Sequence, residues 1–201
     1  IAVLIGIPVG IISATRQYSI FDNISMVLAL VGVSIPAFWL AILLILIFAV
    51  GFGWFPASGW GEFKQVVLPA LTIGTGTVAL IARMTRSSML EVIRADYITT
   101  AKAKGQNRRK VVFNHALPNA LIPIITIIGL EFGNLLGGAV LTESIFSISG
   151  IGRLMVESIK TRDLPMVEGS VLFVAIIYSV INLLVDILYA YVDPRIRSQF
   201  R

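Results

Sequence analysis

The sequence predicts an all-α protein, a polytopic bundle of transmembrane helices, and two observations support this class. Of the 201 residues, 57% are hydrophobic and only 13% are charged, with a mean hydropathy of +0.90. The apolar residues fall into five stretches separated by short polar segments. A soluble domain of this length would need more polar surface than this composition provides. One transmembrane domain covering residues 1–201 is the simplest division, because no internal repeat is apparent.

The first two stretches are predicted as one partial and one complete span. Residues 1–14 are too short to cross alone, since a spanning helix needs about 20 residues. The chain is therefore expected to begin inside a span, with a further N-terminal span missing. Residues 26–50 are long enough to cross with some tilt. Pro36 is expected to kink this helix, and Ser34 to help satisfy the backbone groups that the kink frees.

The remaining spans are predicted at residues 66–82, 120–141 and 169–192, with polar segments between them. In the second of these spans, glycines recur along one face at steps of four residues, at Gly129, Gly133 and Gly137. Small residues at this spacing allow two helix backbones to approach each other closely. We therefore expect this face to pack tightly against another helix.

Positively charged residues are distributed unevenly between the two sides of the predicted bundle. Twelve Lys and Arg residues fall on one side: Arg16, eight between Arg83 and Lys110, and three in the C-terminal tail, against four on the other. Loops rich in Lys and Arg stay in the cytoplasm. The bias predicts a cytoplasmic loop at about residues 84–118 and a cytoplasmic C-terminus.

The most basic segment, residues 96–118, lies between two apolar runs and must be in water beside the membrane. From Leu90 onward, apolar side chains recur at steps of three and four residues, at Leu90, Ile93, Tyr97 and Ala101, which predicts one apolar stripe on a charged helix that needs a partner to cover it. Gly105 is expected to end this helix in the left-handed conformation. Asn107 is expected to cap a second short helix that runs to Pro118.

The spacing in this loop resembles that of the inner-membrane permease subunits of bacterial ABC importers. Those subunits share E-A-A, three residues, Gly, nine residues and I-x-L-P; here Gly105 is followed by nine residues and then by H-A-L-P. Thr99, Thr100 and His115 depart from that pattern. The segments MTRSSMLEV, DYITTAKAKG and HALPNALIP are similar to the dipeptide, oligopeptide, nickel and glutathione permeases, and the similarity covers nearly the whole chain.

The resemblance implies the type I ABC importer fold and a transport subunit without enzymatic activity. It implies import of di- or oligopeptides across the bacterial cytoplasmic (inner) membrane, with nickel or glutathione as alternative cargo. The implied partners are a second, similar permease subunit, two ATPase subunits that hold ATP and Mg, an extracytoplasmic solute-binding protein and membrane lipid. The residues expected to couple the loop to an ATPase are Leu90, Ile93, Tyr97, Thr100, Ala101, Ala103, Lys104, Gly105, Leu117 and Pro118.

Several kinds of site are not expected in this chain. With one histidine and no cysteine, the sequence disfavours a His-rich or thiolate metal centre, and no metal site is expected. No G-x-x-x-x-G-K-[ST] pattern is present to cradle a phosphate, so no cofactor is expected and any ATP must be hydrolysed by a partner. The distribution of basic residues follows membrane topology, so no nucleic-acid partner is expected either.

Two acidic residues fall within predicted spans, where an unpaired charge is costly. Glu131 either lines a cavity that receives a cationic group of the substrate or hydrogen-bonds with Asn134. For Asp186, a structural pair with an arginine or a helix terminus is favoured over a place in the pathway. Neither has a second acidic residue at a spacing that would bring two carboxylates together. An ion-coupled carrier or membrane-embedded enzyme, the alternative class of function, is therefore weakly supported.

Residues 142–168 are too polar to span the membrane and too apolar for a solvated loop. We expect them to fold back over the mouth of the pathway as a re-entrant segment, with Gly150 and Gly152 supplying the turn and Ile148 and Ile151 in the gate. Related permeases carry a gate-like element at this position. The alternative is an amphipathic helix that lies on the outer membrane surface.

Overall fold

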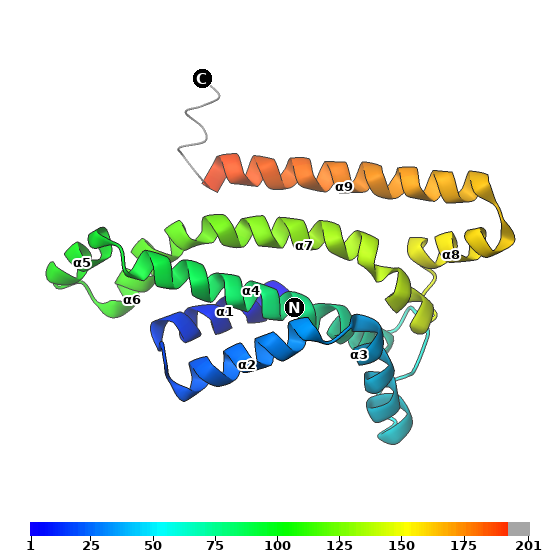
Figure 1. The fold of residues 1–201 in the computed structure, drawn as a ribbon, viewed down its shortest axis with the longest axis horizontal. Helices are drawn as coiled ribbons and strands as arrows, with labels where there is room; N and C mark the ends of the chain where they lie inside the picture. Colours follow the sequence, from blue (N-terminus) through cyan, green and yellow to red (C-terminus); the bar gives the residue numbers. More distant parts are fainter. Residues whose placement is uncertain (193–201) are drawn as a thin grey trace.

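The structure is a computed structural model. It describes the backbone of residues 1–192, and it describes their side chains apart from 136–138, 186 and 188–192. Every regular element in this part of the chain is a helix, and the long helices lie side by side (Figure 1). The all-α bundle predicted from composition is confirmed. The helices, in chain order, are α1 (Ala2–Thr15), α2 (Ile20–Ser34), α3 (Ala37–Leu44), η1 (Ile45–Gly51), α4 (Phe63–Ile93), α5 (Asp96–Ala103), α6 (Arg108–Lys110), η2 (Val111–Ala116), α7 (Leu117–Ile145), α8 (Ile151–Thr161) and α9 (Leu164–Val192).

Within residues 1–192, three helical runs are long and apolar enough to cross a membrane alone. They are α4, the continuous run from α6 through η2 into α7, and α9. A fourth candidate is the pair of α2 with α3 and η1, which is bent by 102° at its break. The remaining predicted stretch forms α1, which has 14 residues and is shorter than a full span.

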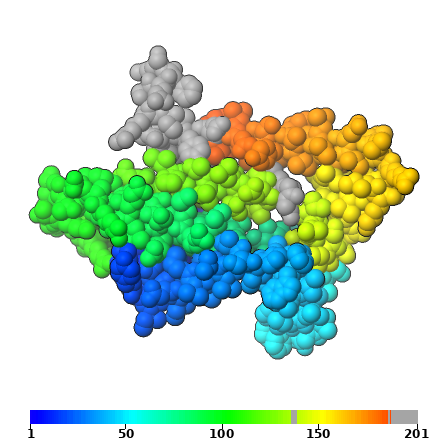
Figure 2. Space-filling model, viewed as in Figure 1, coloured from blue at the N-terminus to red at the C-terminus, as the bar shows by residue number. Residues whose placement is uncertain are grey.

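The break before α3 is much sharper than the kink expected at Pro36. Ile35 and Pro36 both have extended backbone, with ψ of 123° and 134°. Proline lacks the N–H that would continue the helix, and it drives the preceding residue out of the helical region. The Ser34 hydroxyl donates to the carbonyl oxygen of Leu30 at 2.8 Å. As a result, α3 and η1 project from the body of the bundle (Figures 1 and 2).

The central helix α4 packs against α1, α2, α3 and α7. Its contact with α1 depends on Gly6 and Gly10, where an added Cβ would come within 2.8 Å of Ile81 and 2.5 Å of Thr85. These two glycines form a small-xxx-small pair that the sequence reasoning missed. Gly129 and Gly133 likewise face Val185 and Tyr178 of α9 too closely for a Cβ, so the predicted tight face of α7 is confirmed at these two positions. Gly137 lies outside the described side chains.

The turns between helices gather at two ends of the bundle (Figure 1). One end holds the α1–α2 turn together with α5 and α6, and an Arg108 guanidinium N–H donates to the carbonyl oxygen of Thr15 between them. The other end holds α8 and the beginning of α9 (Figure 1). The basic loops that the charge count assigned to one side therefore do lie together.

Candidate functional site

The loop between α4 and α7 forms the first candidate site, and it begins with a break. The single helix expected from Leu90 to Gly105 is wrong: α4 ends at Ile93, and α5 begins at Asp96. Ala95 between them is extended, with ψ of 148°. Asp96 then suits the first turn of α5, because a negative charge is favourable at the positive end of the helix dipole.

The apolar stripe of this loop is largely covered by the chain itself, which corrects the expectation that only a partner would cover it. Ala101 is buried, and Ile98, which the stripe did not include, has no exposed surface. Leu90 and Ile93 pack against the same buried cluster. The buried members of this cluster come from α1, α4, α5, η2 and α7 and are Ile11, Ala14, Met89, Ile98, Ala101, Val111, Ala116, Ala120 and Ile124.

All residues of α5 except Ile98 and Ala101 are exposed, and Tyr97, Thr100 and Ala103, with Lys104 directly after the helix, form a mixed face. The spacing of Tyr97, Thr100 and Lys104 is that of one helix face. Partial burial raises the pKa of the Tyr97 phenol above its ordinary value, and its hydroxyl is neutral at physiological pH with or without this shift. Ile98 and Ala101 anchor α5 in the buried cluster, which holds this face at the end of the bundle. We call it the α5 face.

Two of the predicted loop signals are confirmed, and one is wrong. Gly105 has a φ of +75° and ends α5, and the Asn107 side chain accepts the Arg109 backbone N–H at 3.2 Å. However, the helix that follows does not stop at Pro118. It continues through η2 into α7, with Pro118 in the first turn of α7. Pro118 has no N–H to continue the hydrogen bonds of this run, and it lies just after η2, where the helix changes from π-helical to α-helical geometry.

A buried ion pair that the sequence reasoning missed ties three helices together beside this loop. Arg86 of α4 donates to both carboxylate oxygens of Asp22 of α2, at 2.6 and 2.8 Å. The Ser13 hydroxyl of α1 donates to the same carboxylate, and so does the Tyr18 backbone N–H at 2.9 Å. Asp22 is only 1% exposed. Both residues lie outside the predicted spans, in polar segments where charges are expected, so no signal in the sequence would pair them.

The second candidate site lies between α1, α4 and α7, around Glu131. The Thr77 hydroxyl donates to Oε2 of Glu131 at 3.1 Å, and the Asn134 amide donates to Oε1 at 3.2 Å. The hydrogen bond expected between Glu131 and Asn134 is therefore present. Glu131 also lines a cavity of about 380 Å³. Glu131 thus makes the expected hydrogen bond with Asn134 and also lines a cavity, so the structure is compatible with both interpretations. Thr77 is a partner that the sequence reasoning did not find.

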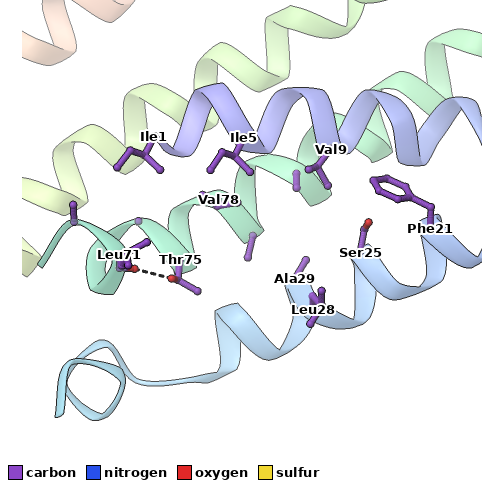
Figure 3. A pocket seen from close by; sticks show the side chains of 14 residues that line it. Ile1, Ile5, Val9, Phe21, Ser25, Leu28, Ala29, Leu71, Thr75 and Val78 are labelled. Carbon is purple, nitrogen blue, oxygen red and sulfur yellow. Dashed lines mark hydrogen bonds between the residues drawn. The ribbon is translucent and has the colours of Figure 1, made fainter. Parts of the chain in front are cut away.

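A neighbouring apolar pocket of about 390 Å³ lies between α1, α2 and α4 and shares Gly74 with the Glu131 cavity (Figure 3). Ile1, directly before α1, and Ile5 and Val9 of α1 line one wall, facing residues of α2 and α4 (Figure 3). The Thr75 hydroxyl donates to its own helix, to the carbonyl oxygen of Leu71 at 2.6 Å. The lining includes no charged residue, and its polar side chains are the hydroxyls of Ser25 and Thr75.

Residues 142–168 consist of the end of α7, a turn, α8 and the beginning of α9. Helix α8 is amphipathic and packs against both α7 and α9. The left-handed residue of the turn is Ser147, with a φ of +54°, so the turn is not supplied by Gly150 and Gly152 as predicted. Ile148 is half-buried against Phe146, and Ile151 begins α8.

The two glycines instead allow close contact between α7 and α8. A Cβ on Gly150 would collide with the Glu143 carboxylate, and one on Gly152 would lie 2.7 Å from Cα of Val140. Glu143 in turn accepts the backbone N–H of Arg153 at 3.0 Å, which satisfies a free donor at the start of α8. As for Asp186, it lies in α9, but its side chain is outside the described residues.

Comparison with known proteins identifies the family. Residues 6–198 match the family model described as "Binding-protein-dependent transport system inner membrane component". The dipeptide transport system permease protein DppB of Alkalihalophilus pseudofirmus is 49% identical over 224 residues, covering 98% of this chain and 67% of that protein. The DppB protein of Escherichia coli K12 is 44% identical over 229 residues, covering 98% of this chain and 68% of its own length.

Two solved structures have a fold similar to that of this chain. Two inward-facing forms of the MetNI methionine ABC transporter align with TM-scores of 0.75 and 0.78, at 21% and 20% identity. Each alignment covers 96% of this chain and 88% of the matched chain. The family match, the identities and the shared helical fold lead to one conclusion: this chain belongs to the binding-protein-dependent inner membrane components, the permease subunits of ABC importers.

Proposed function

We propose that this chain is the permease subunit through which an ATP-driven importer moves di- and oligopeptides across the cytoplasmic membrane. The observation that carries the proposal is the 49% identity to a dipeptide permease across 98% of the chain. A di/tripeptide permease of Pseudomonas aeruginosa is also 44% identical over 96% of it. Nickel or glutathione, moved by the same machinery, are the alternative cargoes.

The proposed assembly contains a second, similar permease subunit, two ATPase subunits and an extracytoplasmic solute-binding protein. ATP and Mg are held by the ATPases. We place the end of the bundle that carries α5 and α6, together with the C-terminus, in the cytoplasm. This orientation is supported by the eight Lys and Arg residues between Arg83 and Lys110. The whole chain then acts as one transmembrane domain.

In this assembly the α5 face docks onto an ATPase subunit. Support comes from its exposure and from its anchoring, because Ile98 and Ala101 of α5 belong to a buried cluster that also contains residues of α1, α4, η2 and α7. A force applied to Tyr97 or Lys104 therefore reaches the membrane helices through packed side chains. Closure of the ATPases moves α5 as a rigid body and biases the pathway between inward-facing and outward-facing states.

The function is tested with the complex purified with its natural partners and reconstituted into vesicles. We expect uptake of a labelled dipeptide to require ATP and the solute-binding protein, and to be competed by other peptides more strongly than by nickel or glutathione. Uptake that follows an ion gradient without ATP would instead indicate a secondary carrier. Stronger competition by nickel or glutathione would replace the peptide cargo but keep the transporter class.

A further inference from the structure

We propose that Glu131 binds the ammonium group of a peptide as it passes through the permease. The proposal rests on the proposed function and adds to it a substrate contact inside the membrane domain. It is carried by three observations: the depth of the carboxylate in the bundle, its hydrogen-bond partners, and the cavity beside it. All three observations are made at Glu131 and the side chains around it.

Glu131 lies at the midpoint of α7, and Thr77 lies within one residue of the midpoint of α4. Both helices belong to runs that are long and apolar enough to cross a membrane. At 1.5 Å per residue, about 20 Å of helix separates the carboxylate from the C-terminal end of α7, and more separates it from the start of the run at Arg108. A carboxylate at this depth is costly unless it faces water or a cation.

The hydrogen bonds to Glu131 hold its carboxylate in place without neutralising it. Thr77 and Asn134 are both neutral donors, one to each oxygen, at 3.1 and 3.2 Å. A carboxylate can accept about four hydrogen bonds, so these two leave capacity for a ligand. Ion pairs within the described side chains join Arg86 to Asp22 and Arg153 to Glu157, and neither includes Glu131.

The cavity beside Glu131 has the chemistry of a site for a cation next to an apolar group. Its volume of about 380 Å³ is at the small end of ligand pockets, which run from about 300 to 1,000 Å³. Apart from Thr77 and Glu131, its lining residues are apolar. An ammonium group beside an apolar side chain is what the N-terminal residue of a peptide presents. An ammonium group on a lysine side chain of the peptide would offer the same charge.

Gly74 provides a position for a probe; it lines both the Glu131 cavity and the neighbouring apolar pocket, so the Glu131 variants show which of the two a peptide occupies. A Cβ added there meets nothing within 4 Å, and the 201 residues include no cysteine, so Gly74→Cys introduces a single thiol into this chain. The complex, purified with its natural partner subunits in lipid nanodiscs, is treated with a water-soluble thiol reagent. The binding protein and ATP are omitted, so that the selectivity of the binding protein does not enter the measurement.

We expect Ala-Ala to slow modification of the thiol and N-acetyl-Ala-Ala to have little effect. At a concentration about four times Kd, mass action leaves about one fifth of the sites free, which slows labelling about fivefold. The added variant Glu131→Gln should abolish the difference between the two peptides, while Glu131→Asp should keep part of it. N-acetyl-Ala-Lys shows whether a side-chain ammonium protects as well. Gly169→Cys in α9, where an added Cβ also meets nothing within 4 Å, is the matched control.

Equal protection by the free and acetylated dipeptides, or a preference that survives Glu131→Gln, would overturn the proposal. So would a thiol at position 74 that the reagent cannot reach, since the cavity would then be closed to water. If Glu131→Gln prevents assembly with the partner subunits, the role of the carboxylate is structural and the proposal is also overturned. ATP-driven peptide uptake by the wild type tests the proposed function separately and can succeed while this subsite fails.

Discussion

At the scale of single residues, the most consequential contacts are made by charges within apolar helices. Asp22 is satisfied by an arginine, a hydroxyl and a backbone N–H at once, so its charge is stabilised despite its burial. Glu131 is satisfied only by neutral donors. The first arrangement is that of a structural clamp. The second leaves a charge available for a ligand.

We expect Asp22→Asn to destabilise the permease, because it leaves Arg86 without its charged partner. Breaking a buried ion pair costs about 3–5 kcal/mol, so the thermal unfolding midpoint of the purified complex should fall clearly. Replacing both partners, with Asp22→Asn and Arg86→Gln together, should cost less than the sum of the single changes. The matched control is Glu157→Gln, which breaks an exposed pair with Arg153 and should cost at most about 1 kcal/mol. Equal midpoints for Asp22→Asn and this control would contradict the clamp.

Gly105 is the residue at which backbone conformation limits substitution. A Cβ there meets nothing within 4 Å, so only its φ of +75° opposes a side chain. A β-branched residue tolerates this conformation poorly, whereas asparagine adopts it more readily. Gly105→Val should therefore lower ATP-driven uptake while ATP hydrolysis continues, and Gly105→Asn should largely restore uptake. Wild-type uptake by Gly105→Val would show that the turn after α5 does not matter for coupling.

At the scale of the elements, α5 is a short helix with one buried side and one exposed side. Ala101 lies on the buried side, and Ala103 lies on the exposed side. This difference distinguishes the α5 face from the apolar stripe predicted by sequence periodicity. The stripe helps to hold α5 onto the membrane helices, and the remaining face is free to meet another subunit.

A cysteine at Ala103 should therefore crosslink to an ATPase subunit in the assembled complex, whereas a cysteine at Ala101 should not. The two positions lie on the same helix, so each serves as the control for the other. The crosslink is made with a disulfide-containing reagent that joins the thiol to nearby amines, and it is read as a band of higher mass that disappears on reduction. Comparable crosslinking at both positions, or none at Ala103 in an active complex, would rule out docking through the α5 face.

At the scale of the whole molecule, the two ends of the bundle carry different structural elements. One end presents the α5 face, and the other carries α8 packed between the end of α7 and the beginning of α9. The long helices α4, α7 and α9 connect the two ends (Figure 1). In a permease subunit that does not itself hydrolyse ATP, movement at one end must reach the other through these packed helices.

If the turn before α8 is a gate, its accessibility should change during transport. A cysteine at Ile148 or Ile151 should change its labelling rate with a water-soluble thiol reagent when ATP and the solute-binding protein are added. Ile148 is packed near Phe146, so we expect it to respond more strongly than an exposed position such as Leu154. Labelling that stays constant through the cycle would favour a helix that lies on the membrane surface.

The sequence by itself determined the features that depend on composition and on neighbouring residues. The membrane class follows from the hydrophobic content, the left-handed Gly105 from the end of a helical pattern, and the cap at Asn107 from the residue type before a helix. The close face at Gly129 and Gly133 follows from spacing along a single helix. These features need no knowledge of how distant segments meet, because local geometry is sufficient to produce them.

Only the tertiary structure decided which distant residues meet. Thr77 and Glu131 are 54 positions apart, and Asp22 and Arg86 are 64 apart, and each pair depends on how long helices pack across one another. Periodicity showed that α5 has an apolar side but not that this chain would cover it. Similarly, the helix runs past Pro118 because η2 joins α7 without a break, and the residues on either side of the proline do not predict this. Packing between elements is a property of the whole chain, and local sequence does not contain it.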